Sequence, residues 1–501
     1  MRMLFPLVLV LLAEQVVSAE TPNSYDWPQW QGTERNAVSQ QPNLLKEWPA
    51  DGPELAWTAT GLGGGYSTPA IAKGYVYGMS NRDGKEIVWS LSEKDGSEVW
   101  ATSLGPESDE GGRQGSEGPA GTPTVDGDRL YVMGATGLLA YLEVADGTIV
   151  WKRNIREDFG GRLPTWRYTE SPLVDGNKVI CTPGGTEATL VALDKMNGEV
   201  IWKCAVPPGE VNNNAEEAGR GESNFNRENF RERFRGRGEG GPEGPGRGER
   251  GDSERGDRES SDRERGEGER GRRGRFGGRR GGPGGGGSGA SYASAITIDF
   301  GGVHQIVQLT ARTLVGISAE DGKLLWRYDE PANPRGTNCS TPLYQDGLVF
   351  ASSAYGNGGG AAKLSQAEDG SITAEEVYFT KDMQNHHGGM VIVDGNLYGA
   401  NGGNGGGFLV CLDFETGELL WRDRSAPKGS LIATSDMLYL LTEEGEILLI
   451  EPNDKKYIEK GRFTIPNRSD SPAWTHPAIA NGKLYLRDQG NLYAYDIKAG
   501  E

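Results

Sequence analysis

The sequence predicts an all-β fold, an eight-bladed β-propeller, from three observations. A hairpin that ends in a tryptophan recurs five times, and VALDKMNGEVIW is one copy. A strand, turn and strand pattern such as ESPLVDGNKVICT precedes each hairpin. The strongest apolar stretches are short, β-branched and bounded by Gly, Asp and Asn, which is typical of many short strands.

The recurrent hairpin is expected to form the outer half of each blade. In every copy an apolar residue lies nine positions before the tryptophan, and Asp-Gly, Asn-Gly or Thr-Gly between them favours a tight turn. The first three of these tryptophans are 51 residues apart, close to the roughly 40 to 50 residues of a propeller blade. The tryptophans expected to dock between blades are Trp100, Trp151, Trp202, Trp326 and Trp421.

The pattern gives eight blades, and the last one is incomplete. Its hairpin, LYAYDIKAGE, stops before any tryptophan, whereas residues 54–59 carry Trp57 on an apolar strand that has no blade of its own. We therefore predict that residues 54–59 complete blade eight and close the ring, which covers an otherwise open sheet edge. In blades five and seven the tryptophan is replaced, with Tyr378 or Phe379 and Phe463 in its place.

Four segments follow from this pattern and from composition. Residues 1–19 have one early basic residue, a short apolar run and small residues near a cleavage site, which predicts a signal peptide and a secreted or periplasmic protein. The run is too short for a membrane span. Residues 20–53 form a lead-in, residues 54–501 the propeller, and residues 210–290 a disordered Arg, Gly and Glu-rich insertion within it.

Charge makes nucleic acid a poor partner. The whole chain carries a net charge of −19, and although residues 220–280 contain 18 Arg, 14 acidic residues are interleaved with them. Phosphate binding needs a clear cationic excess. The four cysteines, Cys181, Cys204, Cys339 and Cys411, are widely spaced, so three pairings are open, and we expect them to be small buried apolar residues.

A candidate binding site is predicted where the chain enters the innermost strand of each blade, because these segments converge on one mouth of the ring. Imidazoles with a carboxylate could transfer protons or hold a metal, and Trp and Tyr could stack on a quinone or a sugar. A wet channel of satisfied polar side chains is the alternative. No metal motif spacing and no catalytic constellation are visible, so no metal is predicted. The candidate residues are Tyr66, Trp166, Tyr168, Glu170, His386, His387, Lys428, Trp474 and His476.

The repeated apolar-x-x-x-x-Asp-Gly-x-x-x-Trp motif resembles the tryptophan-docking repeat of pyrroloquinoline quinone (PQQ) dehydrogenases, and also that of BamB-type outer-membrane assembly factors, which use related repeats without a cofactor. The stretches DWPQWQGTERNAVS, NHHGG and WTHP are similar to exported PQQ-like propeller proteins common in planctomycete-type bacteria. In the quinoprotein alcohol dehydrogenases the quinone lies against a Trp and a vicinal disulfide near Ca²⁺. This chain has no adjacent cysteines.

The resemblance therefore implies a binding or scaffold module in the periplasm or cell envelope, without a cofactor. Its partner would be an envelope protein or a small polar ligand, and we expect a monomer. The alternative is a PQQ-dependent dehydrogenase that oxidises an alcohol or a sugar with PQQ and Ca²⁺.

Overall fold

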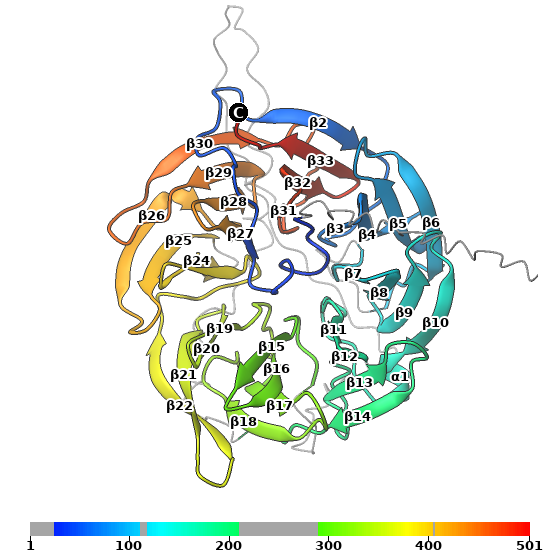
Figure 1. Ribbon diagram of the computed structural model, residues 1–501, viewed down its shortest axis with the longest axis vertical. Helices are drawn as coiled ribbons and strands as arrows, with labels where there is room; N and C mark the ends of the chain where they lie inside the picture. The colour runs from blue at the N-terminus through cyan, green and yellow to red at the C-terminus, as the bar shows by residue number, and fades with distance from the viewer. Residues whose placement is uncertain (1–24, 111–117, 210–288, 404–405, 501) are drawn as a thin grey trace, which may run out of the picture. The chain divides into compact units, whose positions relative to one another are not determined.

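The computed structural model describes residues 25–110, 118–209, 289–403 and 406–500. The predicted signal peptide and nearly all of the predicted insertion lie outside these residues. The described strands form eight sheets, each built on an antiparallel blade of four strands, and one blade gains a fifth, parallel strand from the lead-in; the predicted eight-bladed propeller is confirmed (Figure 1). One helix is present among the described residues, the single turn α1 (Ile155–Asp158), which follows blade two.

The blades follow one another along the chain, each running from the innermost strand to the outermost. Blades one to four are β3 (Ala70–Ala72), β4 (Tyr75–Arg82), β5 (Lys85–Ser92) and β6 (Glu98–Pro106); β7 (Thr124–Asp126), β8 (Arg129–Met133), β9 (Leu138–Glu143) and β10 (Ile149–Asn154); β11 (Leu173–Asp175), β12 (Lys178–Cys181), β13 (Leu190–Asp194) and β14 (Val200–Cys204); and β15 (Ile296–Phe300), β16 (Val303–Leu309), β17 (Leu314–Ser318) and β18 (Leu324–Tyr328).

Blades five to seven continue the series, and blade eight takes its outer strand from the start of the described chain. They are β19 (Leu343–Gln345), β20 (Leu348–Ser353), β21 (Gly358–Gln366) and β22 (Ile372–Thr380); β23 (Met390–Val393), β24 (Asn396–Gly403), β25 (Gly406–Asp413) and β26 (Leu419–Pro427); β27 (Gly429–Thr434), β28 (Leu438–Thr442), β29 (Glu446–Ile450) and β30 (Glu459–Thr464); and β31 (Ala478–Ala480), β32 (Lys483–Asp488), β33 (Asn491–Asp496) and β2 (Glu54–Ala59).

The ring closes as predicted. Strand β2 pairs antiparallel with β33, with Trp57 opposite Ala494, and Figure 1 shows the blue β2 beside the red β33. The Trp57 indole N–H donates to the Glu93 carbonyl oxygen of blade one at 2.9 Å. The first and last blades are thereby joined by both backbone and side-chain contacts.

Docking of the outer tryptophan on the following blade repeats round the ring. The indole N–H donates to a carbonyl just after the next blade's third strand. The rings of Trp57, Trp100, Trp151 and Trp202 also cover the glycine of the next hairpin turn. At Gly96 the backbone φ is 72°, and a Cβ atom would lie 2.6 Å from the Trp57 ring, so both conformation and space require glycine. The same hydrogen bond is made by Trp100 to Val144, Trp151 to Lys195, Trp202 to Ala319 and Trp421 to Asn453.

Blades four and five depart from this pattern. The Trp326 N–H donates within its own blade, to Gln305 Oε1 at 2.7 Å. The turn glycine of blade five, Gly370, has no atom within 4 Å of its Cβ position, so no aromatic ring of blade four covers it. Blade five then docks on blade six through Tyr378, whose hydroxyl donates to the Phe414 carbonyl at 2.8 Å.

The lead-in crosses the centre of the ring, as Figure 1 shows in dark blue. Its short strand β1 (Val38–Ser39) pairs in parallel with β27, and Trp27 forms a bridge with Ile71 of β3. Buried Arg35 donates to the carbonyls of Ser171 and Pro172 at the start of blade three. The lead-in thus holds blades on several sides of the ring, which its sequence did not reveal.

Beside the lead-in lies a cavity of about 380 Å³. The first strands of blades four, five and six form its other side. It is lined by Glu34, Arg35, Asn36, Val38, Ile296, Thr297, Pro342, Leu343, Tyr344, Gln345 and Ile392.

The cysteines are free; Cys181, Cys204 and Cys411 are buried, and Cys339 is partly exposed. Burial raises the pKa values of all four thiols, that of Cys204 to about 11 and those of Cys339 and Cys411 to about 12. All four thiols therefore stay protonated and unreactive at neutral pH. In the described part of the chain no helix has the length and apolar character of a membrane span.

Candidate functional site

The candidate site is a network of side chains at the mouth of the ring, the end at which the chain enters each innermost strand. Two kinds of segment meet there: those that lead into the first strand, and the turns that join the second strand to the third. His386 and His387 precede β23, Lys428 precedes β27, and Glu443 lies in the turn between β28 and β29. Segments of blades six and seven therefore supply these four residues, which we call the histidine cluster.

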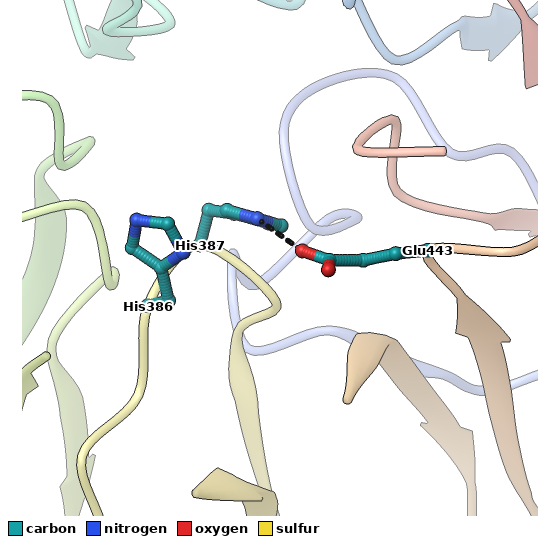
Figure 2. A group of neighbouring side chains, drawn as sticks. All are labelled: His386, His387 and Glu443. Carbon is teal, nitrogen blue, oxygen red and sulfur yellow. Dashed lines mark hydrogen bonds and ion pairs between the residues drawn. The ribbon is translucent and has the colours of Figure 1, made fainter. Parts of the chain in front are cut away.

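Glu443 lies at the centre of the histidine cluster. Its Oε1 accepts from His387 Nε2 at 3.0 Å and from Lys428 Nζ at 2.8 Å. Figure 2 shows the side chains of His387 and Glu443 reaching toward each other from different blades. The Trp474 indole N–H, from the segment before β31, donates to the same oxygen at 3.0 Å. Three donors on one oxygen fix the positions of all three partner side chains.

Burial and charge decide the protonation of these groups. Burial alone would raise the pKa of the Glu443 carboxyl group, but the hydrogen bond from His387 and the nearby Lys428 ammonium outweigh it and lower that pKa to about 2. Burial lowers the pKa values of His386 and His387, and the Lys428 ammonium lowers both further. The cluster therefore holds one carboxylate, one ammonium and two neutral imidazoles at neutral pH.

Aromatic side chains surround the cluster. The Trp474 ring lies between Tyr66, with a centroid separation of 5.3 Å, and His387, at 5.1 Å. His476 is buried and donates from Nε2 to the His387 carbonyl at 2.7 Å. Trp30 of the lead-in packs on His476 at 4.5 Å and donates to Thr341 Oγ1 at 2.8 Å. The lead-in therefore forms part of the site.

The arrangement offers possible metal ligands together with a competing cation. One side-chain atom each from His386, His387 and Glu443 lie within 4.8 Å of one another. However, Lys428 Nζ lies 2.8 Å from Glu443 Oε1 and 3.3 Å from His386 Nδ1, so the ammonium already supplies the positive charge that the carboxylate needs. A metal ion in this group would have to displace that ammonium.

The structure brings six of the nine candidate residues into this network. They come from blades one, six, seven and eight: Tyr66, His386, His387, Lys428, Trp474 and His476.

The other three candidates precede β11 of blade three and contact different partners. The Trp166 backbone N–H donates to the Tyr292 hydroxyl at 3.3 Å. Tyr168 is buried among core residues and donates to the Pro183 carbonyl at 2.9 Å. The Glu170 carboxylate accepts from the backbone N–H and the hydroxyl of Thr182, and burial raises its pKa to about 7.

Three members of the network were missed in the sequence: Glu443, Tyr355 and Trp30. Tyr355 lies in the turn between β20 and β21, and its hydroxyl is 2.5 Å from His386 Nε2. A topological rule could have found Tyr355 and Glu443, because the turns between second and third strands open at the same end as the entering segments. No local pattern marks Trp30, whose place depends on how the lead-in crosses the ring.

A sequence comparison with protein families finds one described as "Outer membrane protein assembly factor BamB", which matches residues 84–226, 284–406 and 405–501. The chain belongs to this family. No curated protein matches the chain.

Solved structures with the same fold include members of two functional classes. BamB from Moraxella catarrhalis is 13% identical, with a TM-score of 0.50, and the match covers 87% of this chain and 95% of that one. Quinohemoprotein alcohol dehydrogenase from Comamonas testosteroni is 14% identical, with a TM-score of 0.56, over 95% and 81% of the two chains. A europium-containing methanol dehydrogenase is 13% identical, with a TM-score of 0.55, over 93% and 90%. At these identities the likeness is one of fold, the PQQ-like β-propeller.

Proposed function

We propose that the protein is an exported binding module of the cell envelope, in which the propeller is the scaffold and the mouth of the ring takes a small polar ligand. The observation that carries this proposal is the convergence of Tyr66, the histidine cluster, Trp474 and His476 from four blades on one network. Convergence of polar and aromatic side chains from distant parts of a chain is what a binding site requires. The match to a family named for assembly at the outer membrane supports the envelope location and a partner protein there.

Binding is favoured over catalysis by the protonation of the cluster. A general base works best with a pKa near the working pH. The carboxyl group of Glu443, with a pKa of about 2, is too weak a base, and burial makes the His386 and His387 imidazoles weak bases as well. The groups are thus suited to donate and accept fixed hydrogen bonds rather than to move protons.

A PQQ-dependent dehydrogenase acting on an alcohol or a sugar is the second candidate, favoured by the fold match to quinohemoprotein alcohol dehydrogenase over 95% of this chain. The histidine cluster does not offer the ligands of the Ca²⁺ ion that a PQQ-dependent dehydrogenase would need. Calcium takes six to eight oxygen ligands, whereas this group offers two imidazoles and one carboxylate that is already paired with Lys428. We therefore rank this function below binding.

Retention of small molecules by the purified protein tests the proposal. The protein is dialysed against a small-molecule extract of bacterial envelopes, and bound compounds are measured by mass spectrometry. We expect enrichment by the wild type and by His304→Ala, a control on β16 whose imidazole bonds to Asp299 and Asp175, and loss of it in His387→Ala. Equal enrichment by His387→Ala would reject the site.

A separate assay tests the hypothesis that the protein is a PQQ-dependent dehydrogenase. The protein is incubated with PQQ and Ca²⁺, then with alcohols or sugars and an artificial electron acceptor. We expect no turnover; dye reduction that His387→Ala abolishes would reverse the ranking.

A further inference from the structure

The inner edge of every blade faces the central channel, because the other side of each innermost strand pairs with the second strand of its blade. In an antiparallel pair, the backbone N–H and C=O groups of alternate residues point away from the partner strand. Ile71 of β3 is such a residue, and it exchanges two hydrogen bonds of 2.8 Å with Trp27 of the lead-in. Val125 of β7 is another, and its N–H donates to the Pro28 carbonyl oxygen at 2.8 Å. Consecutive residues of the lead-in therefore pair with the inner edges of two adjacent blades.

Three inner edges have no such partner. In a hairpin with a two-residue turn, the channel-facing residues are the first and the third before the residue that flanks the turn, as Ile71 and Val125 show for the first position. The register places Tyr344 and Ile392 at the first position in β19 and β23, and Thr297 at the third position in β15. No described residue outside their own blades bonds to the backbone groups of these three residues. Such an open edge is a template for another strand.

The pattern of prolines sets the edge of blade four apart. In blades one, two, three, five and eight the third position is a proline, which has no backbone N–H to face the channel. Met390 of blade six is buried at this position, and in blade seven the Leu431 N–H donates to the Gly388 carbonyl at 2.8 Å. Blade four has Thr297, which is exposed, so its N–H is available at the channel. The five prolines are Pro69, Pro123, Pro172, Pro342 and Pro477.

These free edges border the cavity of about 380 Å³ beside the lead-in, and Thr297, Tyr344 and Ile392 are among its lining residues. Ligand pockets range from about 300 to 1,000 Å³, so this one suits a short segment. Ile296 and Leu343 add apolar surface next to the free backbone groups. A sheet edge binds an extended peptide through main-chain hydrogen bonds, and pockets beside the edge select its side chains. The cavity therefore fits a short extended peptide that carries an apolar side chain.

A segment of another protein suits this cavity better than a segment of this chain. Residues 220–280 consist largely of Gly, Arg, Glu and Asp, and they contain no Val, Ile or Thr. β-Branched residues favour strands, whereas Gly, Asp and Glu are depleted in them. In a second copy of the chain, the lead-in is the described segment that pairs with inner edges, and it is already paired in its own ring. An extended, β-branched segment of a partner protein meets neither objection.

From these contacts we propose that the cavity beside the lead-in binds an extended segment of a partner protein by strand addition. The backbone of that segment pairs with the free edges at Thr297, Tyr344 and Ile392, and an apolar side chain contacts Ile296 and Leu343. The lead-in makes the same kind of contact with the inner edges of other blades. The proposal goes beyond the ligand site at the mouth, because none of these residues belongs to that network, so either site can fail its test without the other.

Peptides that differ in their backbone test the pairing. The full-length protein is titrated with the fluorescent, end-blocked peptides Ser-Thr-Val-Thr-Ser and Ser-Thr-Ile-Thr-Ser, and with forms N-methylated at the three central residues; binding is measured by fluorescence anisotropy. N-methylation keeps the side chains and removes the N–H donors. We expect at least one unmodified peptide to bind, and its N-methylated form to bind at least tenfold more weakly. Hydrogen exchange measured by mass spectrometry should slow in β15, β19 and β23 on binding and stay unchanged in β11, which does not line the cavity.

Two variants of Thr297 form a matched pair. Thr297→Pro removes the N–H that faces the cavity, and proline already occupies this position in five other blades. The loss of one hydrogen bond should weaken binding about threefold to tenfold. Thr297→Ala keeps the N–H and should bind like the wild type. The N-methylated peptides decide the question if Thr297→Pro does not fold.

Three results would overturn the proposal: equal binding by the two variants, equal binding of the N-methylated peptides, or no binding of any peptide. Binding that appears only after residues 215–287 are replaced by a short Gly and Ser link would assign the cavity to the insertion, and it would overturn the proposal as well.

Discussion

Closure of the ring by Trp57 can be tested by truncating that side chain. Trp57 is 8% exposed, covers Gly96, and lies 5.9 Å from the Tyr485 ring between centroids. Trp57→Ala removes this packing, at a cost of about 3 to 5 kcal/mol. It also leaves the Glu93 carbonyl without its indole donor, which adds about 1 kcal/mol. We therefore expect the free energy of unfolding to fall by roughly 5 kcal/mol.

The corresponding change in melting temperature is small but measurable. With about 2.1 cal/mol/K of unfolding entropy per residue, a cooperative ring of about 400 residues would melt roughly 5 to 6 °C lower. Trp57→Phe keeps most of the packing and loses the hydrogen bond, so its drop should be about a third as large. Differential scanning calorimetry measures both.

Hydrogen exchange distinguishes closure from a general loss of core. In Trp57→Ala the amides of β33 that pair with β2 should exchange faster, because their partner strand is no longer anchored. Trp151→Ala removes the same kind of docking contact between blades two and three and should leave β33 protected. A melting temperature within 1 °C of the wild type, with β33 still protected, would show that the ring closes without Trp57.

Four further predictions concern separate features. Burial lowers the pKa of His476 to about 4 in the folded protein, so between pH 6.5 and pH 4 the unfolded chain binds a proton that the folded protein does not. The free energy of unfolding should therefore fall by about 3 kcal/mol as the pH is lowered over that range. Urea unfolding of the wild type should show this pH dependence, and His476→Gln should show less of it. Lys428→Ala removes the ammonium from the histidine cluster and should allow it to bind Co²⁺, detected by visible absorption that the wild type does not give. Tyr378→Phe removes the bond to the Phe414 carbonyl and should cost about 1 kcal/mol in the same urea assay. Replacing residues 215–287 by a short Gly and Ser link should leave the melting temperature unchanged, since blades three and four are complete on either side; a protein that no longer folds would contradict this.

The repeat made the fold predictable because its physical basis is local. A tight turn needs glycine, and the tryptophan that covers the next turn recurs at a fixed spacing. The absence of a tryptophan after the last hairpin therefore predicted that Trp57 completes blade eight. Trp326 shows the limit of this reasoning. Its own hairpin follows the pattern, but its indole N–H donates to Gln305 of the same blade and the turn glycine of the next hairpin, Gly370, is not covered. The motif of one hairpin does not encode the geometry of the next blade.

The site was less predictable because it depends on which segments meet at the mouth. His387 and Trp474 stood in segments that the topology brings together, and they are in contact. Tyr168 and Glu170 lie in the equivalent segment of blade three, but Tyr168 packs in the core and Glu170 accepts hydrogen bonds from Thr182. Glu443, in a turn rich in acidic residues, had the sequence of an ordinary surface turn.

The path of the lead-in constrains the order of assembly. Trp27 and β1 leave the ribosome early, yet β1 pairs with β27, and Tyr25 bonds to Asn481, which is 456 residues later. Contacts so distant in sequence slow folding, because a long loop must close before they form. The ring therefore cannot close until its last blade has been synthesised, and β1 and β2 have no partner strands until blades seven and eight, respectively, have been made. A chain stalled or cut before blade eight would lose two of its eight joints between blades, leave β2 without a partner strand, and expose the apolar faces of blades one and seven that blade eight covers.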